Sequence, residues 1–280
     1  MRKDNAEENR VALVTGSSSG FGLACAVALA ARGLRVYGTS RRADLPAPGG
    51  PEHGLVMIPM DVRDADSVQA AVDFLMSREG RIDVLVNNAG FGLSGAVEDT
   101  TSEEALQQLQ TNFFGLHRAC RAVLPVMRAR GSGLVINIGS IAGRIALPFE
   151  GLYSASKHAV AALSDALRME VAPFGIRVTL LEPGDFRTDF TANRMRAAAA
   201  ESPESPYGSR FLRAVGVAET DERNGADPRD LARLVTRLID QAAVRPRYLL
   251  GPRSQTFLTR VRWLLPDRWF ERLLMSHYRV

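Results

Sequence analysis

The sequence predicts one doubly wound α/β domain, in which helices flank both faces of a seven-stranded parallel sheet. Short runs rich in Val, Ile and Leu recur along the chain, and longer stretches with helical periodicity separate them. This alternation is typical of βαβ units on a buried parallel sheet. The chain has 280 residues, 46% hydrophobic and 24% charged, which suits one large globular domain. Neither a repeat nor a linker divides it, so we expect residues 1–280 to form a single domain.

Each element follows from a local pattern. The apolar runs predict strands at 11–15, 35–39, 55–60, 82–86, 133–138, 176–181 and 247–250. The periodic stretches predict helices at 21–32, 64–78, 102–130, 152–172 and 228–243, and glycines near several of their ends are typical stop signals. The proline- and glycine-rich segment Ala43 to Gly54 is expected to be a surface loop, and Arg194 to Gly208 a mobile insertion.

Val11 to Ala31 contains no charged residue, which raises the question of a membrane span or a signal peptide. The turn residues from Thr15 to Gly22 interrupt this run, and the acidic residues before it are unusual for a signal sequence. Two cysteines are too few for a disulfide framework. We therefore expect a cytoplasmic protein without a targeting segment.

The positive charge is concentrated at one end of the chain. Residues 245–280 hold eight arginines against Asp267 and Glu271, while the other 244 residues carry a small negative charge, so no nucleic-acid partner is expected. Only Lys3 and Lys157 are lysines among the 35 basic residues. Lys157 is therefore a candidate for chemistry that a guanidinium cannot supply.

The segment from Thr15 to Gly22 joins the first predicted strand to the first predicted helix. A glycine turn there lets backbone N–H groups and a helix N-terminus approach a pyrophosphate, although a tight structural turn is the alternative. The end of the second strand, Gly38 to Arg42, holds no carboxylate, and Ser40, Arg41 and Arg42 stand there instead. Guanidinium groups at this place favour the 2′-phosphate of NADP, and a solvated basic loop is the alternative.

Tyr153 and Lys157 are spaced by four residues, so on a helix they share one face. An adjacent cation is expected to lower the pKa of the phenol and make it a usable proton donor or acceptor. Ser140 follows a predicted buried strand and precedes Tyr153 by 13 residues. This combination in a nucleotide-binding fold predicts catalysis rather than a surface pair.

Together with Asn87 to Gly90, Asn112, Pro183-Gly184 and Thr188, these motifs make residues 8–252 resemble the short-chain dehydrogenase/reductase family, with its Rossmann-type fold. The resemblance implies that Tyr153 is the acid/base and that Lys157 lowers its pKa and holds the nicotinamide ribose. It also implies that Ser140 binds the substrate oxygen and that Asn112 supports a proton relay. The residues implied to bind NADP(H) are Gly16, Ser18, Ser19, Gly20, Phe21, Gly22, Ser40, Arg41, Arg42, Asp61, Val62, Asn88, Ala89, Gly90, Tyr153, Lys157, Pro183, Gly184 and Thr188.

The sequence around Tyr153 resembles the hydroxysteroid and retinol dehydrogenase branches in particular. The expected substrate pocket is apolar and consists of Phe91, Leu93, Ile145, Leu147, Phe149, Phe186 and Phe190. Such a lining suits a lipophilic alcohol or ketone, unless part of it packs the core instead.

Two other functions are compatible with parts of the sequence. A redox-silent nucleotide-binding regulator would keep the glycine turn, but it would not need Ser140, Tyr153, Lys157 and Asn112 together. A sugar epimerase or dehydratase usually carries a larger C-terminal substrate domain. The four histidines show no spacing with Cys or acidic residues that suits a metal, and none is expected.

Residues 253–280 are predicted to form an amphipathic helical tail that Pro266 interrupts. Phe257, Leu258, Val261, Leu264 and Leu265 share one predicted face, and Trp269, Phe270, Leu273 and Leu274 begin a second face. We favour packing of these faces beside the substrate pocket, on the domain or on a partner subunit of a homodimer or homotetramer. Contact with an anionic membrane surface is the alternative, because arginines flank both faces.

Overall fold

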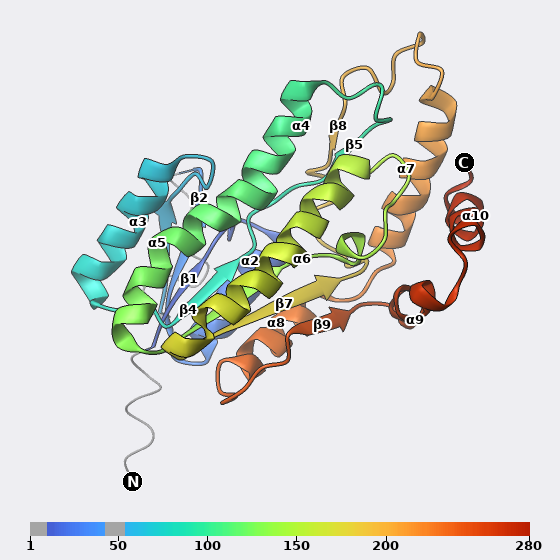
Figure 1. Cartoon of the computed structure of the whole chain (residues 1–280). Coiled ribbons are helices and arrows are strands. Elements are labelled where there is room, and N and C mark those ends of the chain that lie inside the picture. Colours follow the sequence, from blue (N-terminus) through green and yellow to red (C-terminus); the bar gives the residue numbers. More distant parts are fainter. Residues whose placement is uncertain (1–9, 43–53) are drawn as a thin grey trace.

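The computed structural model describes residues 10–42 and 54–280, and it contains the predicted seven-stranded parallel sheet (Figure 1). The strand order is β3-β2-β1-β4-β6-β7-β9, so the order reverses between β1 and β4. The strands are β1 (Val11–Val14), β2 (Arg35–Ser40), β3 (Leu55–Pro59), β4 (Val84–Asn87), β6 (Gly133–Ile138), β7 (Ile176–Pro183) and β9 (Arg247–Leu250). In folds of this kind, ligands bind beyond the carboxyl ends of the strands at such a reversal.

Helices cover both faces of the sheet, as the sequence predicts. One face packs against α3 (Ala65–Glu79), α5 (Gly115–Arg130) and α6 (Gly151–Val171). The other face packs against α2 (Gly20–Ala31) and α8 (Pro228–Leu238). The side chains of Asp64 and Asp227 accept hydrogen bonds from the first turns of α3 and α8, which explains where these two helices begin.

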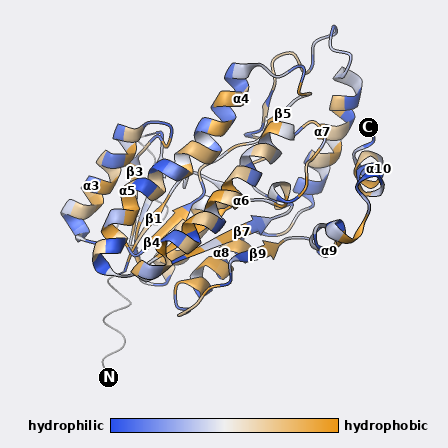
Figure 2. Ribbon diagram, in the orientation of Figure 1, coloured by the Kyte–Doolittle hydropathy of each residue, from blue (hydrophilic) through white to orange (hydrophobic). Residues whose placement is uncertain are grey.

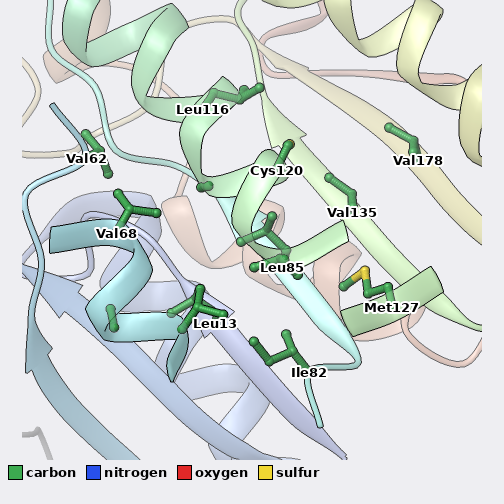
Figure 3. Close-up of a cluster of buried hydrophobic side chains, with 14 of the residues drawn as sticks. Leu13, Val62, Val68, Ile82, Leu85, Leu116, Cys120, Met127, Val135 and Val178 are labelled. Carbon is green, nitrogen blue, oxygen red and sulfur yellow. The ribbon is translucent and has the colours of Figure 1, made fainter. Parts of the chain in front are cut away.

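The side chains of successive strand residues point alternately into two apolar cores, one on each side of the sheet. Leu13 packs among the residues under α3 and α5, as Figure 3 shows, whereas its neighbours Ala12 and Val14 pack under α2 and α8. Figure 2 shows that the strands are largely apolar along their length. This two-sided burial explains why the strands read as continuous apolar runs.

Three predictions of local structure need correction. The helix predicted over 102–130 is divided into α4 (Ser102–Leu109), the π-helical turn η2 (Gln110–Phe114) and α5. The segment 194–208, predicted to be a mobile insertion, contains strand β8 (Met195–Arg196), which pairs with β5 (Leu93–Ser94). Arg194 anchors this segment, because its side chain is only 2% exposed and forms an ion pair with Glu150. Helix α7 (Gly208–Arg223) was not predicted at all. The loop expected at 43–54 lies almost wholly outside the described residues.

The C-terminal tail forms helix α9 (Arg253–Val261), the short 3-10 turn η5 (Arg262–Leu264) and helix α10 (Asp267–Tyr278), as the break at Pro266 predicts. Helix α10 lies beside α7 at one edge of the molecule (Figure 1). Because η5 is not α-helical, Leu264 and Leu265 do not continue the packed face of Leu258, and both are exposed. No helix in the described part of the chain is long and apolar enough to cross a bilayer.

Candidate active site

The glycine turn connects β1 to α2 at the reversal of strand order. Gly16 and Gly20 have φ values of +66° and +56°, which favour glycine. A Cβ atom on Gly16 would stand 2.8 Å from the Cα atom of Ala89, so the loop after β4 also requires glycine here. The side chain of the N-cap residue, Ser19, forms no capping bond among the described residues. The N–H groups of the first turn of α2 are therefore suited to bind a phosphate.

Asn88 and Thr15 fasten this turn to the end of β4. The Asn88 Nδ2 atom donates hydrogen bonds to the carbonyl oxygens of Thr15 at 3.0 Å and Gly16 at 2.9 Å. The backbone N–H groups of Asn88 and Ala89 each donate to the Thr15 hydroxyl at 2.9 Å. These side-chain bonds add to the backbone bonds that Thr15 donates to Val86 and Ser17 donates to Thr39.

A cavity of about 1330 Å³ opens beside this turn and extends to Tyr153. Its volume exceeds the roughly 300–1,000 Å³ of ordinary small-molecule pockets and suits a dinucleotide with a substrate. Every residue predicted to bind the cofactor lines it except Gly22. Gly22 is instead packed against Gly16 and Asn88, with no room for a side chain. Its role is therefore close packing rather than contact with the cofactor.

Three guanidinium groups line the cavity beyond β2 and β3. Arg41 and Arg42 are exposed and directly follow β2, and the Arg42 N–H donates to the Ser40 hydroxyl at 3.2 Å. The third, Arg63, was not predicted; it forms an ion pair of 2.7 Å with Asp61 and holds the pKa of that carboxyl below its usual range. Because Arg63 lies two residues after Asp61, which was predicted to bind the cofactor, the sequence could have indicated it. Among the described residues Arg41 and Arg42 form no ion pair of this kind, although the charge of Arg41 also lowers the pKa of Asp61.

Ser140, Tyr153 and Lys157 meet in the same cavity. Ser140 follows β6, and its hydroxyl accepts a hydrogen bond of 3.1 Å from the N–H of Ala142. Tyr153 and Lys157 lie on α6 and are buried. The Lys157 ammonium donates to the carbonyl oxygen of Ile138 at 3.0 Å and lies 5.8 Å from the centre of the Tyr153 ring. The predicted i, i+4 pair therefore does share one space.

The predicted effect of Lys157 on Tyr153 is not found in this structure. Burial raises the pKa of Tyr153, as do the nearby carboxylates of Glu150 and Glu222, whereas the Ser140 hydroxyl, which can hydrogen-bond the phenolate, and Arg194 lower it. Burial also lowers the pKa of Lys157 to about 8, because the ammonium has lost its water. Spacing alone did not reveal that both groups are buried.

This burial predicts a pH dependence of stability. Between pH 8 and 10.5, the unfolded chain holds a proton on Lys157 that the folded protein has largely lost. The site therefore stabilises the folded state more as the pH rises through this window. We expect the free energy of unfolding of wild type, relative to Lys157→Met, to rise between about pH 8 and 10. Urea melts of both proteins measure this difference, and a difference that is flat or falls would contradict the burial of an ammonium.

Asn112 lies in the π-helical turn η2 and does not line the cavity. Its Oδ1 atom accepts from the N–H of Phe91 at 3.0 Å, and its Nδ2 atom donates to the Phe91 carbonyl at 2.9 Å and to the Ser156 hydroxyl at 3.1 Å. Asn112 thus joins the loop after β4 to α6, close to Tyr153. The proton relay implied for it stays a prediction.

Five of the seven predicted substrate-pocket residues line the cavity: Phe91, Ile145, Leu147, Phe186 and Phe190. The other two residues, Leu93 and Phe149, do not line it. Leu93 is buried in β5, and Phe149 packs edge-on against Phe211 of α7. The sequence pattern revealed neither β5, which contains Leu93, nor α7, against which Phe149 packs.

Residues from the tail complete this apolar end, including Leu258, Leu274 and Tyr278. Besides Asp61 at the cofactor end, four carboxylates line the cavity: Glu150, Asp185, Asp221 and Glu222. Arg194 pairs with both Glu150 and Glu222, yet burial still raises the pKa of Glu150 to about 7. These residues come from distant parts of the chain, so no local spacing could have indicated them.

Comparison with known proteins agrees with this geometry. The family model for short chain dehydrogenase matches residues 10–199. The chain belongs to the short-chain dehydrogenase family. It is 41% identical over 271 residues to the 3-ketodihydrosphingosine reductase of Bacteroides thetaiotaomicron, covering 97% of this chain and 98% of that protein.

Two solved structures show how closely this short-chain dehydrogenase follows the family fold. A short-chain dehydrogenase from Streptomyces avermitilis is 36% identical with a TM-score of 0.79, covering 96% of this chain and 97% of the other. A short-chain dehydrogenase/reductase from Burkholderia phymatum in complex with NAD is 25% identical with a TM-score of 0.78, covering 91% and 93%. The chain is accordingly an oxidoreductase of a fold that binds nicotinamide cofactors, and the hydroxysteroid and retinol branch is compatible with these likenesses.

Proposed function

We propose that this protein is an NADP-dependent oxidoreductase that acts on a lipophilic secondary alcohol or ketone. One observation carries the proposal: a single cavity is lined by Arg41 and Arg42, by the group Ser140, Tyr153 and Lys157, and by apolar side chains. A bound nicotinamide supplies or accepts the hydride at the carbinol carbon. The protein supplies the proton and the positions of the reacting groups.

The roles of the catalytic side chains follow from their placement. In the direction of reduction, the Tyr153 hydroxyl donates its proton to the carbonyl oxygen as the hydride reaches the carbonyl carbon. The Ser140 hydroxyl, beside Tyr153 in the cavity, hydrogen-bonds the same oxygen. The Lys157 ammonium, already bonded to Ile138, holds the cofactor ribose.

The preference for NADP rests on charge. The Burkholderia phymatum relative binds NAD, so the fold by itself does not decide between the two cofactors. Arg41 and Arg42 are exposed at the end of β2, where a 2′-phosphate would be bound. Charge-assisted hydrogen bonds from guanidinium groups suit this phosphate, and no carboxylate among the described residues of β2 or its end would serve the ribose of NAD.

The substrate class rests on the apolar end of the cavity. Phe91, Ile145, Leu147, Phe186 and Phe190 form a lining that favours a lipophilic molecule, and the tail extends it. The Bacteroides thetaiotaomicron relative is named for the reduction of 3-ketodihydrosphingosine. A long-chain ketone is therefore the first candidate.

The test is a screen of NADPH oxidation over steroids, retinoids, long-chain ketones and quinones, with NADH in parallel. We expect long-chain ketones to give the highest rates, with NADPH preferred. Rates confined to small polar carbonyl compounds would reject the substrate class. We also propose that the protein is cytoplasmic and forms a homodimer or homotetramer. Light scattering of the purified protein measures the size of the assembly.

Lys157→Arg is expected to lower kcat by roughly 10²-fold or more. The buried pocket that fits one ammonium beside the Ile138 carbonyl does not fit a planar guanidinium with five donors. Steady-state rates measure the loss, and circular dichroism shows whether the variant folds. A folded variant with near-normal kcat would remove Lys157 from the mechanism.

A further inference from the structure

The C-terminal tail exposes an unusual number of large apolar side chains. We call seven of them the tail patch: Phe257, Trp263, Leu264, Leu265, Trp269, Leu273 and Met275. The described residues hold 16 exposed large hydrophobic side chains in all, so nearly half lie within these 19 positions. Trp263 is 77% exposed and Trp269 is 69% exposed. Clusters of this kind mark contact sites rather than ordinary surface.

The tail patch remains exposed although the tail itself is packed. Phe270 and Leu274 are buried and pack with Ile145, and Leu258 packs beside them. His277 bonds Asp221 of α7 at 2.8 Å, and Arg213 donates to the carbonyl oxygen of Arg279 at 3.2 Å. Folding thus covers one side of α9 and α10 and leaves the side chains of the tail patch exposed.

Positive charge accompanies the tail patch. Residues 253–280 contain six arginines against Asp267 and Glu271, a net side-chain charge of +4. Arg260, Arg268 and Arg272 are exposed between the apolar side chains. Tryptophan and arginine side by side are typical of segments that lie at the interface of an anionic bilayer.

We propose that the tail patch docks this protein on an anionic lipid bilayer. The same helices contribute Leu258, Leu274 and Tyr278 to the cavity wall, so docking would bring the cavity close to the lipid. Delivery of a lipophilic substrate by this route rests on the proposed function, whereas the docking itself does not. A second copy of the chain is a less suitable occupant, because a two-fold interface would bring the same arginines together.

The sequence provides a direct probe of docking, since Trp263 and Trp269 are its only tryptophans. The full chain is mixed with vesicles of phosphatidylglycerol and phosphatidylcholine, or of phosphatidylcholine alone. We expect flotation with the anionic vesicles and a blue shift of tryptophan emission, both lost at about 1 M salt, where the screening length is roughly 3 Å. Absence of flotation and of the shift at low salt would overturn the proposal.

Paired variants test whether the tail patch carries the binding. Trp263→Ser with Leu264→Ser should weaken flotation at least about tenfold, and so should Arg260→Glu with Arg268→Glu. Matched controls alter equally exposed positions elsewhere: Val97→Ser with Met169→Ser, and Arg121→Glu with Arg237→Glu. Equal losses in the test and control variants would overturn the assignment.

Two further readouts separate the alternatives. Sedimentation without lipid shows whether the tail-patch variants are smaller oligomers than the wild type. If they are, and if the tryptophan emission of the wild type is blue-shifted even without lipid, the tail patch would be an interface with a second copy. Rates with a short, water-soluble ketone should be unchanged in Trp263→Ser with Leu264→Ser, since neither residue lines the cavity. A protein that binds vesicles but reduces no ketone would reject the proposed function and leave the docking in place.

Discussion

Tyr153→Phe is expected to lower kcat by about 10²–10⁴-fold or more, with NADPH affinity close to that of wild type. Only the hydroxyl that transfers the proton is lost, and the ring keeps its contact with Phe190, whose centre lies 5.5 Å away. Stopped-flow rates with a long-chain ketone and NADPH fluorescence titration measure the two quantities. Tyr207→Phe is the matched control, because Tyr207 lies outside the cavity and bonds Glu98.

The two quantities also distinguish a catalytic role from a structural one. If Tyr153→Phe lost NADPH binding and turnover together, the residue would act by supporting the fold of the site. Near-normal kcat in a folded variant would contradict its role as the acid. We expect neither, because Tyr153 is held by α6, which packs against β7 and η2.

Arg41→Ala with Arg42→Ala is expected to reverse the preference between cofactors. Each charge-assisted hydrogen bond to the 2′-phosphate contributes about 1.5–3 kcal/mol, so the pair should weaken NADPH by roughly 10²-fold or more. NADH lacks that phosphate, and its kcat/KM should change little. Steady-state kinetics with both cofactors measure the ratio.

A control variant of equal charge change is Arg229→Ala with Arg233→Ala on α8, away from the cavity. It should leave the ratio of NADPH to NADH unchanged. Equal loss of both cofactors in the Arg41 and Arg42 variant would show that these side chains do not bind the phosphate. Arg63 would then be the next candidate, although Asp61 already occupies it.

The parts of the fold that depend on local patterns were predictable from the sequence. Strand β6 is buried on both sides, so it appears as an apolar run, and Gly131 ends α5 in the left-handed conformation that a stop signal predicts. The meeting of Ser140, Tyr153 and Lys157 also follows from chain order, because β6 and α6 are adjacent in the βαβ pattern.

The parts that depend on tertiary packing were not predictable. The π-helical turn at Asn112 differs from an α-helix by one hydrogen-bond step, and Asn112 within it bonds the distant backbone of Phe91. Phe149 is apolar and precedes Tyr153, but it packs against Phe211 of helix α7, which no pattern indicated, and does not line the cavity. The tail pattern predicted two helical faces that pack beside the substrate pocket, but it did not show that Leu258 and Leu274 themselves line its wall.

The central claim is hydride transfer from NADPH to a lipophilic ketone, and isotope transfer tests it most directly. The wild-type protein is given 3-ketodihydrosphingosine, the substrate named for the Bacteroides thetaiotaomicron relative, and NADPH that carries deuterium at C4 of the dihydronicotinamide. Mass spectrometry of the product should show an alcohol with one deuterium on the former carbonyl carbon. Ketone recovered unchanged beside unoxidised NADPH, under conditions where the protein is folded and binds the cofactor, would contradict the account for this substrate.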